Sequence, residues 1–263
     1  MNMGKRGQIT VFIILGIVII AVILFLFLFF RKGPSELQAE QEELAIKDLE
    51  ARNVYLFIKD CLKKTSEEAL FHFGYDGGRT GFFTQFYDYG IYSVPYYYYE
   101  GISYIPEEDE ISDGILGRYV DDNLMICIDN FNSFQGMRIE YNTPSTVAKI
   151  APEKVMFNLN FPVDVYKGQD IIRLGPDFKA ETNVRLGDIL SICRTIIENQ
   201  LTNELFIHWD YITEKTKQGF EITAYTENDN TIIYRIIDEK NQLFEENYLF
   251  QFANKYYIKP VES

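Results

Sequence analysis

Hydrophobic residues fill positions 9 to 30 without a single charged side chain, and most of them are Ile, Leu, Val or Phe. At about 1.5 Å of helical rise per residue, such a run crosses a hydrocarbon core of about 30 Å. The pattern therefore predicts a transmembrane helix over 9–30 that anchors the chain in a lipid bilayer. The run is longer than the roughly 7–15 apolar residues of a secretory signal, and no small-residue cleavage site follows, so we expect the helix to be retained.

A second helix is predicted over 35–73, after Gly33-Pro34 has ended the first one. Apolar residues recur there at intervals near 3.6, with Glu and Lys between them; examples are Leu44, Leu49, Val54, Phe57, Ile58, Cys61 and Leu62. Two interpretations remain open. The helix is either a stalk or pilin-like spine, or the first helix of the domain that follows.

The remaining chain alternates between helical and strand patterns. A Gly-rich turn over 74–81 is followed by a predicted hairpin, Tyr96 to Tyr99 and Ile102 to Ile105, turned at Glu100-Gly101. Further elements are a helix from Pro106 to Cys127, strands over 138–141, 146–150, 155–165 and 170–174, a helix over 186–201, a hairpin of 220–225 with 231–237, and a strand over 248–252.

These elements predict an α+β protein: an N-terminal transmembrane helix, a long amphipathic helix, and then an antiparallel sheet with packed helices. The predicted segments are a cytoplasmic head or processed leader over 1–8, the transmembrane helix over 9–30, a stalk-like helix over 31–73 and an extracellular domain over 74–263. The basic residues flanking the apolar run are nearly balanced, but four Glu follow it closely. This asymmetry favours a cytoplasmic N-terminus and an outer C-terminal domain in a single-pass cell-membrane protein.

The domain after Lys32 is strongly acidic. It retains 21 Lys and Arg against 39 Asp and Glu, a formal charge of −18. Such a charge repels phosphate backbones and anionic headgroups, so nucleic acid is not an expected partner. The expected partners are the bilayer, through residues 9–30, and a protein or glycan outside the cell.

Three cysteines, Cys61, Cys127 and Cys193, each stand among apolar residues. Cys61 and Cys127 both fall late in a predicted helix, so an oxidising exterior would favour a disulfide between those two helices. The alternative is that all three are buried thiols that act as small apolar residues.

Tyr96, Tyr97, Tyr98 and Tyr99 form the densest aromatic run of the chain. Alternate side chains of a strand point to opposite faces, so two of the four could be exposed and bind a glycan or a protein. The alternative is that the four rings cover a core or a neighbouring strand.

No catalytic or metal-binding motif is present. The chain has two histidines, His72 and His208, and lacks the H-E-x-x-H, C-x-x-C, G-x-S-x-G and G-x-x-x-x-G-K patterns. We therefore expect no metal, no cofactor and no catalytic residue. A hydrolase with two paired carboxylates remains arithmetically open among the 39 Asp and Glu.

The segment Lys5-Arg6-Gly7-Gln8-Ile9-Thr10 leads directly into the apolar run. It resembles the class III signal peptide of archaeal type IV pilin-like proteins, which implies cleavage between Gly7 and Gln8 by a prepilin peptidase. Phe12 stands where pilin subunits usually carry Glu, so the resemblance bears more on membrane delivery than on filament assembly. An uncleaved signal anchor is the alternative.

The rest of the chain resembles a group of uncharacterised single-span membrane proteins of small-genome archaea. The segments that carry this resemblance are Phe57 to Leu62, Asp76-Gly77-Gly78, Pro95 to Tyr99 and Cys127. The sequence thus favours a non-enzymatic surface protein, either a pilin-like component or an adhesin-like binding module that uses the Tyr-rich face.

Overall fold

A computed structural model describes residues 16, 19–20, 48–78, 85–89, 92–203, 207–227 and 230–256. The chain divides into two compact units, Met1–Asp48 and Leu49–Ser263. Gly7, Gln8 and nearly all of the predicted span 9–30 lie outside the described residues. Within the described ranges, no helix combines the length and the apolar character needed to cross a membrane.

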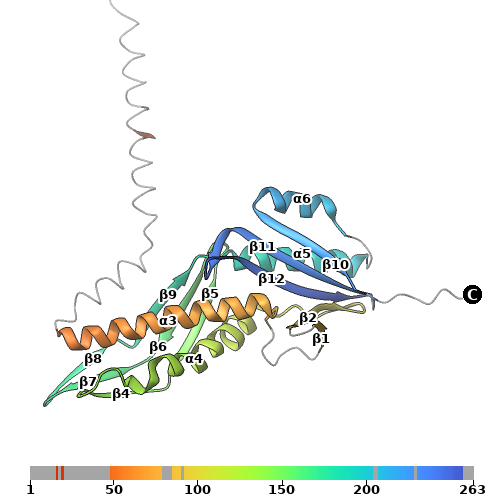
Figure 1. The fold of residues 1–263 in the computed structure, drawn as a ribbon. Coiled ribbons are helices and arrows are strands. Elements are labelled where there is room, and N and C mark those ends of the chain that lie inside the picture. Colours follow the sequence, from red (N-terminus) through yellow and green to blue (C-terminus); the bar gives the residue numbers. More distant parts are fainter. Residues whose placement is uncertain are drawn as a thin grey trace, which may run out of the picture. The chain divides into compact units, whose positions relative to one another are not determined.

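The second unit is α+β, as predicted (Figure 1). Its helices are α3 (Leu49–Tyr75), the π-helix η1 (Glu110–Gly117), α4 (Arg118–Ile128), the 3-10 turn η2 (Asp129–Phe131), α5 (Leu186–Thr202) and α6 (Trp209–Lys217). Its strands are β1 (Phe86–Tyr89), β2 (Tyr92–Tyr99), β3 (Ile102–Ser103), β4 (Arg138–Tyr141), β5 (Ser145–Ile150), β6 (Val155–Asn160), β7 (Val163–Lys167), β8 (Asp170–Leu174), β9 (Asp177–Thr182), β10 (Phe220–Thr226), β11 (Thr231–Leu243) and β12 (Glu246–Lys255).

Helix α3 packs against α4, η1, β8, β9 and β12 (Figure 1). Its first half places Tyr55 on Phe178 of β9, with ring centroids 5.1 Å apart. Its last turns place Phe73 on Phe250 of β12, with centroids 5.6 Å apart. Buried positions begin at Ala51, and the contacts divide the chain before this helix, so the described part of the predicted stalk belongs to the folded domain.

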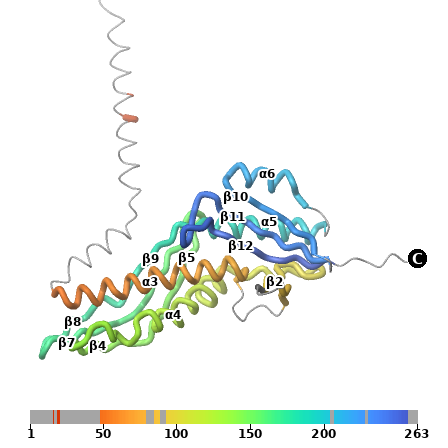
Figure 2. The backbone as a smooth tube through the Cα atoms, in the orientation of Figure 1, coloured from red at the N-terminus to blue at the C-terminus, as the bar shows by residue number. Residues whose placement is uncertain are grey.

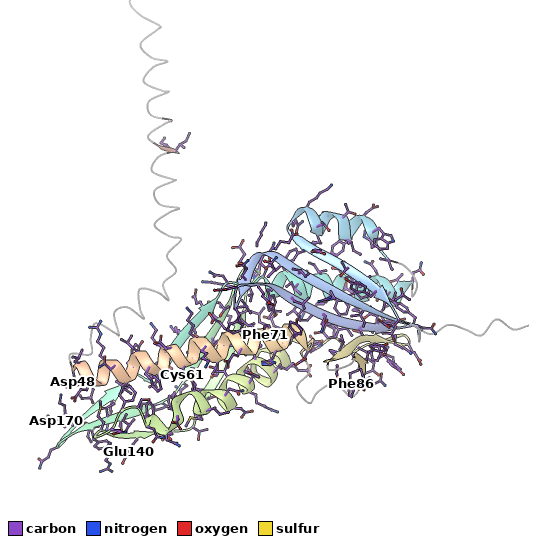
Figure 3. The ribbon with its side chains drawn as sticks, viewed as in Figure 1. Asp48, Cys61, Phe71, Phe86, Glu140 and Asp170 are labelled. Carbon is purple, nitrogen blue, oxygen red and sulfur yellow. A yellow bond between two sulfur atoms is a disulfide. The ribbon has the colours of Figure 1, made fainter. Side chains whose placement is uncertain are left out.

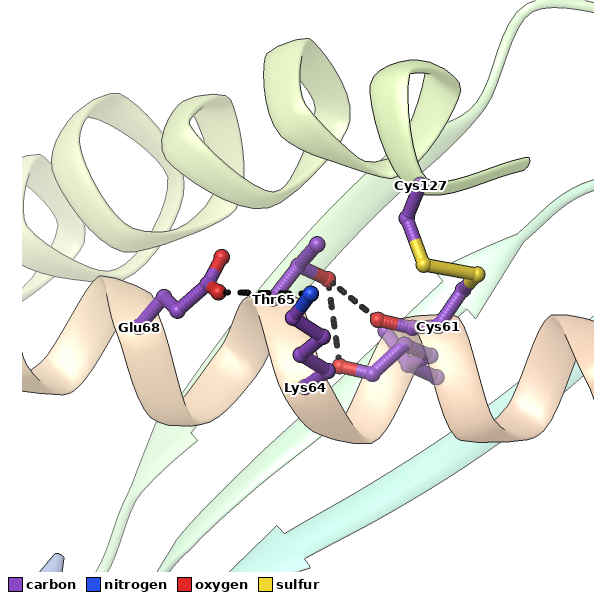
Figure 4. The surroundings of a disulfide bond; sticks show 6 residues. Cys61, Lys64, Thr65, Glu68 and Cys127 are labelled. Atoms are coloured by element: carbon purple, nitrogen blue, oxygen red, sulfur yellow. Dashed lines mark hydrogen bonds and ion pairs between the residues drawn. A yellow bond between two sulfur atoms is a disulfide. The ribbon is translucent and has the colours of Figure 1, made fainter. Parts of the chain in front are cut away.

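A disulfide between Cys61 of α3 and Cys127 of α4 joins the two helices, as the sequence predicts (Figure 4). Cys193 is the free cysteine and is buried in α5. Beside the disulfide, Thr65 donates its hydroxyl to the carbonyl oxygen of Cys61 at 2.9 Å, which satisfies this buried side chain inside the helix.

Three prolines divide a three-stranded ribbon into two small sheets, β4-β7-β8 and β5-β6-β9 (Figure 2). Pro144, Pro162 and Pro176 separate β4 from β5, β6 from β7, and β8 from β9. Proline has no N–H for the ladder, so each strand breaks where it occurs. The strand predicted over 155–165 is therefore two strands.

The largest sheet has the order β1-β2-β12-β11-β10, with β3 paired to β2. The hairpins β10–β11 and β11–β12 are antiparallel, but β12 and β2 pair in parallel, with Ala253 opposite Tyr96. The expectation of a purely antiparallel sheet is wrong for this sheet, because β2 and β12 come from distant parts of the chain and no hairpin sets their direction.

The end of α3 touches the edge of β12 through glycines. A Cβ at Gly74 would lie 2.1 Å from the carbonyl oxygen of Leu249, and one at Gly77 would lie 2.4 Å from that of Gln251. Gly77 also has φ +56°, a left-handed conformation that glycine tolerates. The glycine turn predicted after the helix thus allows helix and strand backbones to meet.

We expect the double substitution Cys61→Ser and Cys127→Ser to lower the free energy of unfolding by roughly 4 kcal/mol, from the chain-entropy cost of a 66-residue loop. Thermal unfolding of the full-length protein, with and without reductant, measures this. Three thiols that react with an alkylating agent in the unreduced, denatured protein, instead of one, would contradict the disulfide.

We expect Gly74→Ala to destabilise the protein by about 1–3 kcal/mol, because the new methyl group overlaps the backbone of β12. Lys63→Ala on the exposed side of the same helix is the control and should leave the unfolding midpoint nearly unchanged. Equal midpoints for the two variants would show that α3 does not press on β12 in solution.

Candidate functional site

The two faces of the six-stranded sheet differ in their covering. On one face, Tyr234, Phe250 and Phe252 are fully buried beneath α5, whose Gln200 donates to the Tyr234 hydroxyl at 2.8 Å. Side chains alternate along a strand, so Ile233, Arg235 and Ile237 of β11 point to the other face. Arg235 lies on that face between Thr223 of β10 and Gln251 of β12.

Two adjacent hollows lie on this second face, with volumes of about 290 Å³ and about 270 Å³. Both are lined by Tyr75 and Arg235, so we describe them together as the Arg235 groove. The first hollow is completed by Phe71, Glu221, Ile237, Leu243, Glu246, Asn247, Tyr248 and Leu249, and the second by Val94, Tyr225, Glu227, Ile233 and Gln251. Figure 3 places Phe71 at the end of α3, beside this sheet.

Arg235 carries an unsatisfied donor at the floor of the groove. Its Nε is buried without a hydrogen-bond partner, and none of the described carboxylates forms an ion pair with its guanidinium group. A buried donor without an acceptor costs about 1–3 kcal/mol. The groove therefore holds an arginine whose own domain does not satisfy it.

Aromatic rings and acceptor groups surround this arginine. The rings of Phe71 and Tyr75 lie 5.0 Å apart along α3, and Tyr225 is 48% exposed on β10. Glu221, Glu246 and Asn247 are exposed at the rim of the first hollow. The arrangement offers stacking surfaces, hydrogen-bond acceptors and one strong donor group, which is the chemistry of a binding site.

The groove contains no familiar catalytic set. The described residues that line it include no His, Cys, Ser or Lys that could act as a nucleophile or as its base. Two glutamates, Glu221 and Glu246, share the first hollow, but both are exposed, so no difference in burial gives them separate acid and base roles. In the described ranges, no group of three or more His, Cys, Asp or Glu could hold a metal ion.

The binding face predicted for Tyr96, Tyr97, Tyr98 and Tyr99 is wrong. The first three are 5%, 0% and 2% exposed, and Tyr99 is half-buried with its ring 5.2 Å from that of Tyr96. Tyr97 stacks on Phe252 at 5.1 Å and donates its hydroxyl to Gly77, while Tyr98 packs on Tyr256. Strand β2 lies inside the sheet with both faces covered, so its tyrosines form core and not surface.

The two histidines of the chain do not line the groove. His208 caps α6 by accepting the backbone N–H of Tyr211 at 3.2 Å. His72 is exposed near the end of α3, with Asp76 at 4.0 Å. Both histidines lie outside the Arg235 groove.

A second arginine, Arg185, has a structural role and provides a comparison with Arg235. Arg185, at the start of α5, is 7% exposed and donates its Nε to fully buried Asp238 at 3.0 Å. Its other nitrogens reach the carbonyl oxygens of Gln218 and Gly219 at 2.9 and 2.8 Å, and its guanidinium group lies 3.7 Å from the centre of the Phe220 ring. Every side of this cation is occupied, in contrast to Arg235.

The pKa of Asp238 is set by two opposed effects. Burial is the larger single influence and disfavours the charged carboxylate. Hydrogen bonds from Arg185, Asn241 and the backbone N–H of Lys240 together outweigh burial and hold the pKa below its ordinary value. Asp238 is therefore a charged structural anchor that joins β11 to the start of α5.

The sequence contains a local signal for Arg235, which the assignment of helices and strands by periodicity does not use. Arg235 is a single charge inside the apolar run Ile232-Ile233-Tyr234-Arg235-Ile236-Ile237. A strand with this pattern has one face that is wholly apolar and one that is interrupted by a cation. The aromatic wall of Phe71 and Tyr75 comes from α3, 160 or more positions earlier, and no local pattern reveals that neighbour.

Comparisons with known proteins found no matching family model, no matching curated protein and no matching solved structure.

We expect Asp238→Asn to cost about 3–5 kcal/mol at neutral pH, because it leaves the buried Arg185 without its counter-charge. The folded pKa of Asp238 is lowered, so its stabilisation is present above the unfolded value of about 3.9 and is lost as the pH falls through the folded value. Thermal unfolding of the parent and the variant, followed from about pH 7 down to about pH 2, measures the cost of the substitution at neutral pH and the loss of the stabilisation in acid.

The matched control is Asp164→Asn, which removes the half-buried partner of the exposed Arg173, 3.7 Å away. Because that pair is solvent-screened, its loss should leave the midpoint nearly unchanged. If the two variants unfolded alike at neutral pH, the buried pair would not be the anchor described here.

Proposed function

We propose that the protein is a non-enzymatic, membrane-anchored surface protein whose second unit binds a partner through the Arg235 groove. The observation that carries this proposal is the unsatisfied Arg235 at the floor of two adjoining hollows with partly exposed aromatic walls. The uncharged run over 9–30 supports the anchor. The disulfide supports an oxidising location such as the cell exterior.

Within the second unit, the groove lies at the end of α3 opposite to Leu49. Leu49 begins α3, and the groove lies beside Phe71 and Tyr75 at the other end of that helix. At about 1.5 Å per residue, the helix separates the two ends by roughly 40 Å. A rigid helix of this length holds the groove well away from the residue at which the chain enters the second unit.

A pilin-like role is the second candidate, and one specific observation favours it. Lys5-Arg6-Gly7-Gln8 directly precedes the apolar run, as in the leader of archaeal type IV pilin-like proteins. The single helix α3 that follows the predicted membrane segment is compatible with a pilin-like spine. Both roles require the same membrane anchor and outer domain, and they differ in whether the leader is cleaved.

The test is intact mass and N-terminal sequencing of the full-length protein from native membranes, together with protease treatment of intact cells. We expect the protein to resist carbonate extraction and its second unit to be cut by external protease. A chain that begins at Gln8 would favour the pilin-like role, and one that begins at Met1 would favour a signal-anchored binding protein. Release by carbonate, or protection until the cells are lysed, would overturn the surface assignment.

A further inference from the structure

We propose that the ligand of the Arg235 groove is an oligosaccharide that carries a carboxylate, such as a uronic acid unit, and that this carboxylate binds the guanidinium group of Arg235. The inference rests on the proposed binding function and adds the chemical class of the ligand. Three features of the groove carry it: the unsatisfied cation, the position on the face of the sheet, and the mixture of rings with acceptor groups.

The unsatisfied cation calls for an acceptor from outside the domain. A guanidinium group presents its N–H donors in a planar fork that matches a carboxylate in two parallel hydrogen bonds. The Nε of Arg235 is one prong of that fork and is buried without a partner. Because Nε is closed to solvent, a ligand carboxylate would pair with the two terminal nitrogens, which have no acceptor among the described residues, and would form a charge-assisted pair.

The position of the groove disfavours a peptide that adds as a strand. Strand addition needs the free N–H and C=O groups of a sheet edge. Arg235 lies on β11, whose backbone pairs with β10 on one side and β12 on the other. The floor therefore offers side chains alone, and the ligand must be recognised through its own polar groups and flat faces.

The lining suits the hydroxyl groups and apolar faces of sugars. Glu221, Glu246 and Asn247 offer acceptor oxygens at the first hollow, and Glu227 is half-buried at the second. Tyr225 presents an exposed ring on which a sugar face could stack. The two hollows have similar volumes and meet at Arg235, so two neighbouring sugar units could share its guanidinium group.

The charge of the protein limits how acidic that ligand can be. The chain carries −14 overall, and glutamates line both hollows around the single arginine. A polyanion such as nucleic acid would meet repulsion everywhere except at Arg235. One carboxylate among neutral hydroxyl groups satisfies the arginine and leaves the glutamates to accept hydrogen bonds.

The test is calorimetric titration of the full-length protein in detergent with three probes: a galacturonic acid disaccharide in which one carboxyl is methyl-esterified, the neutral galactose disaccharide of the same linkage, and a dipeptide with a free C-terminal carboxylate. We expect the acidic disaccharide to bind best. Arg235→Gln should weaken its binding at least tenfold, and Arg235→Lys should weaken it less, because lysine keeps the charge but loses the planar fork.

Arg173→Gln is the matched control, since Arg173 is an exposed arginine of β8, far from the groove in sequence and in a different sheet. It should bind the acidic disaccharide as the parent does. Arg235→Gln should not lower the unfolding midpoint, because Arg235 has no hydrogen-bond partner among the described residues and its buried Nε is an unsatisfied donor. Tyr225→Ala provides a second groove variant, with a loss of binding expected from the missing ring.

Three results would overturn the inference. Equal affinity for the neutral disaccharide would remove the role of the carboxylate, and preference for the dipeptide would replace the sugar by a peptide carboxylate. Absence of binding by all three probes would reject the uronate ligand. None of these results touches the surface assignment, which protease accessibility and membrane extraction decide separately.

Discussion

The buried face of α3 is the constraint on which the second unit depends. This helix of 27 residues packs on two separate sheets and contributes buried side chains to the core of each. Its first half packs on the three-stranded ribbon through Tyr55, and its end meets β12 through Phe73 and Gly74. The disulfide to α4 fixes a second helix against the same spine (Figure 4). Phe71 and Tyr75 line the groove from the same end of α3 at which Gly74 contacts β12. The packing of α3 on β12 therefore also positions the aromatic wall of the groove.

Arg185 and Arg235, on opposite faces of the largest sheet, differ in how their guanidinium groups are satisfied. Arg185 is enclosed by Asp238, two backbone carbonyls and an aromatic ring, and together they make it part of the framework. Arg235 lies on the opposite face of the sheet, with its Nε buried and unpartnered. Burying a donor without an acceptor is unfavourable. Six other buried side-chain atoms of the described residues also lack a partner, and Arg235 is the one of the seven residues that lines the two hollows. The same domain thus satisfies one buried arginine fully and leaves the other without an acceptor.

The tyrosines illustrate why an aromatic run is an ambiguous signal. Tyr offers apolar area and a polar tip, and both exposed binding faces and buried strands use that combination. In β2 the hydroxyl groups find partners inside the protein, such as Thr231 for Tyr96 and Gly77 for Tyr97, so burial costs little. Whether a strand lies at an edge or in the interior depends on a partner more than 150 positions away, which no local pattern contains. Tyr225, which the sequence did not single out, is the exposed aromatic residue of the groove.

By itself, the sequence determined the α+β class, the hairpin at Glu100-Gly101 and the glycine turn after the first helix of the domain. It also offered Cys61 with Cys127 as the preferred disulfide, with three buried thiols as the alternative. Each of these follows from local periodicity, turn chemistry or the positions of residues late in two amphipathic helices. Only the tertiary structure decided the parallel pairing of β2 with β12, the burial of Tyr96 to Tyr98, the Arg185–Asp238 anchor and the Arg235 groove. These features join segments far apart in the chain, and long-range packing, which assigns each strand its neighbours and each side chain its solvent exposure, is not encoded in any short window of residues.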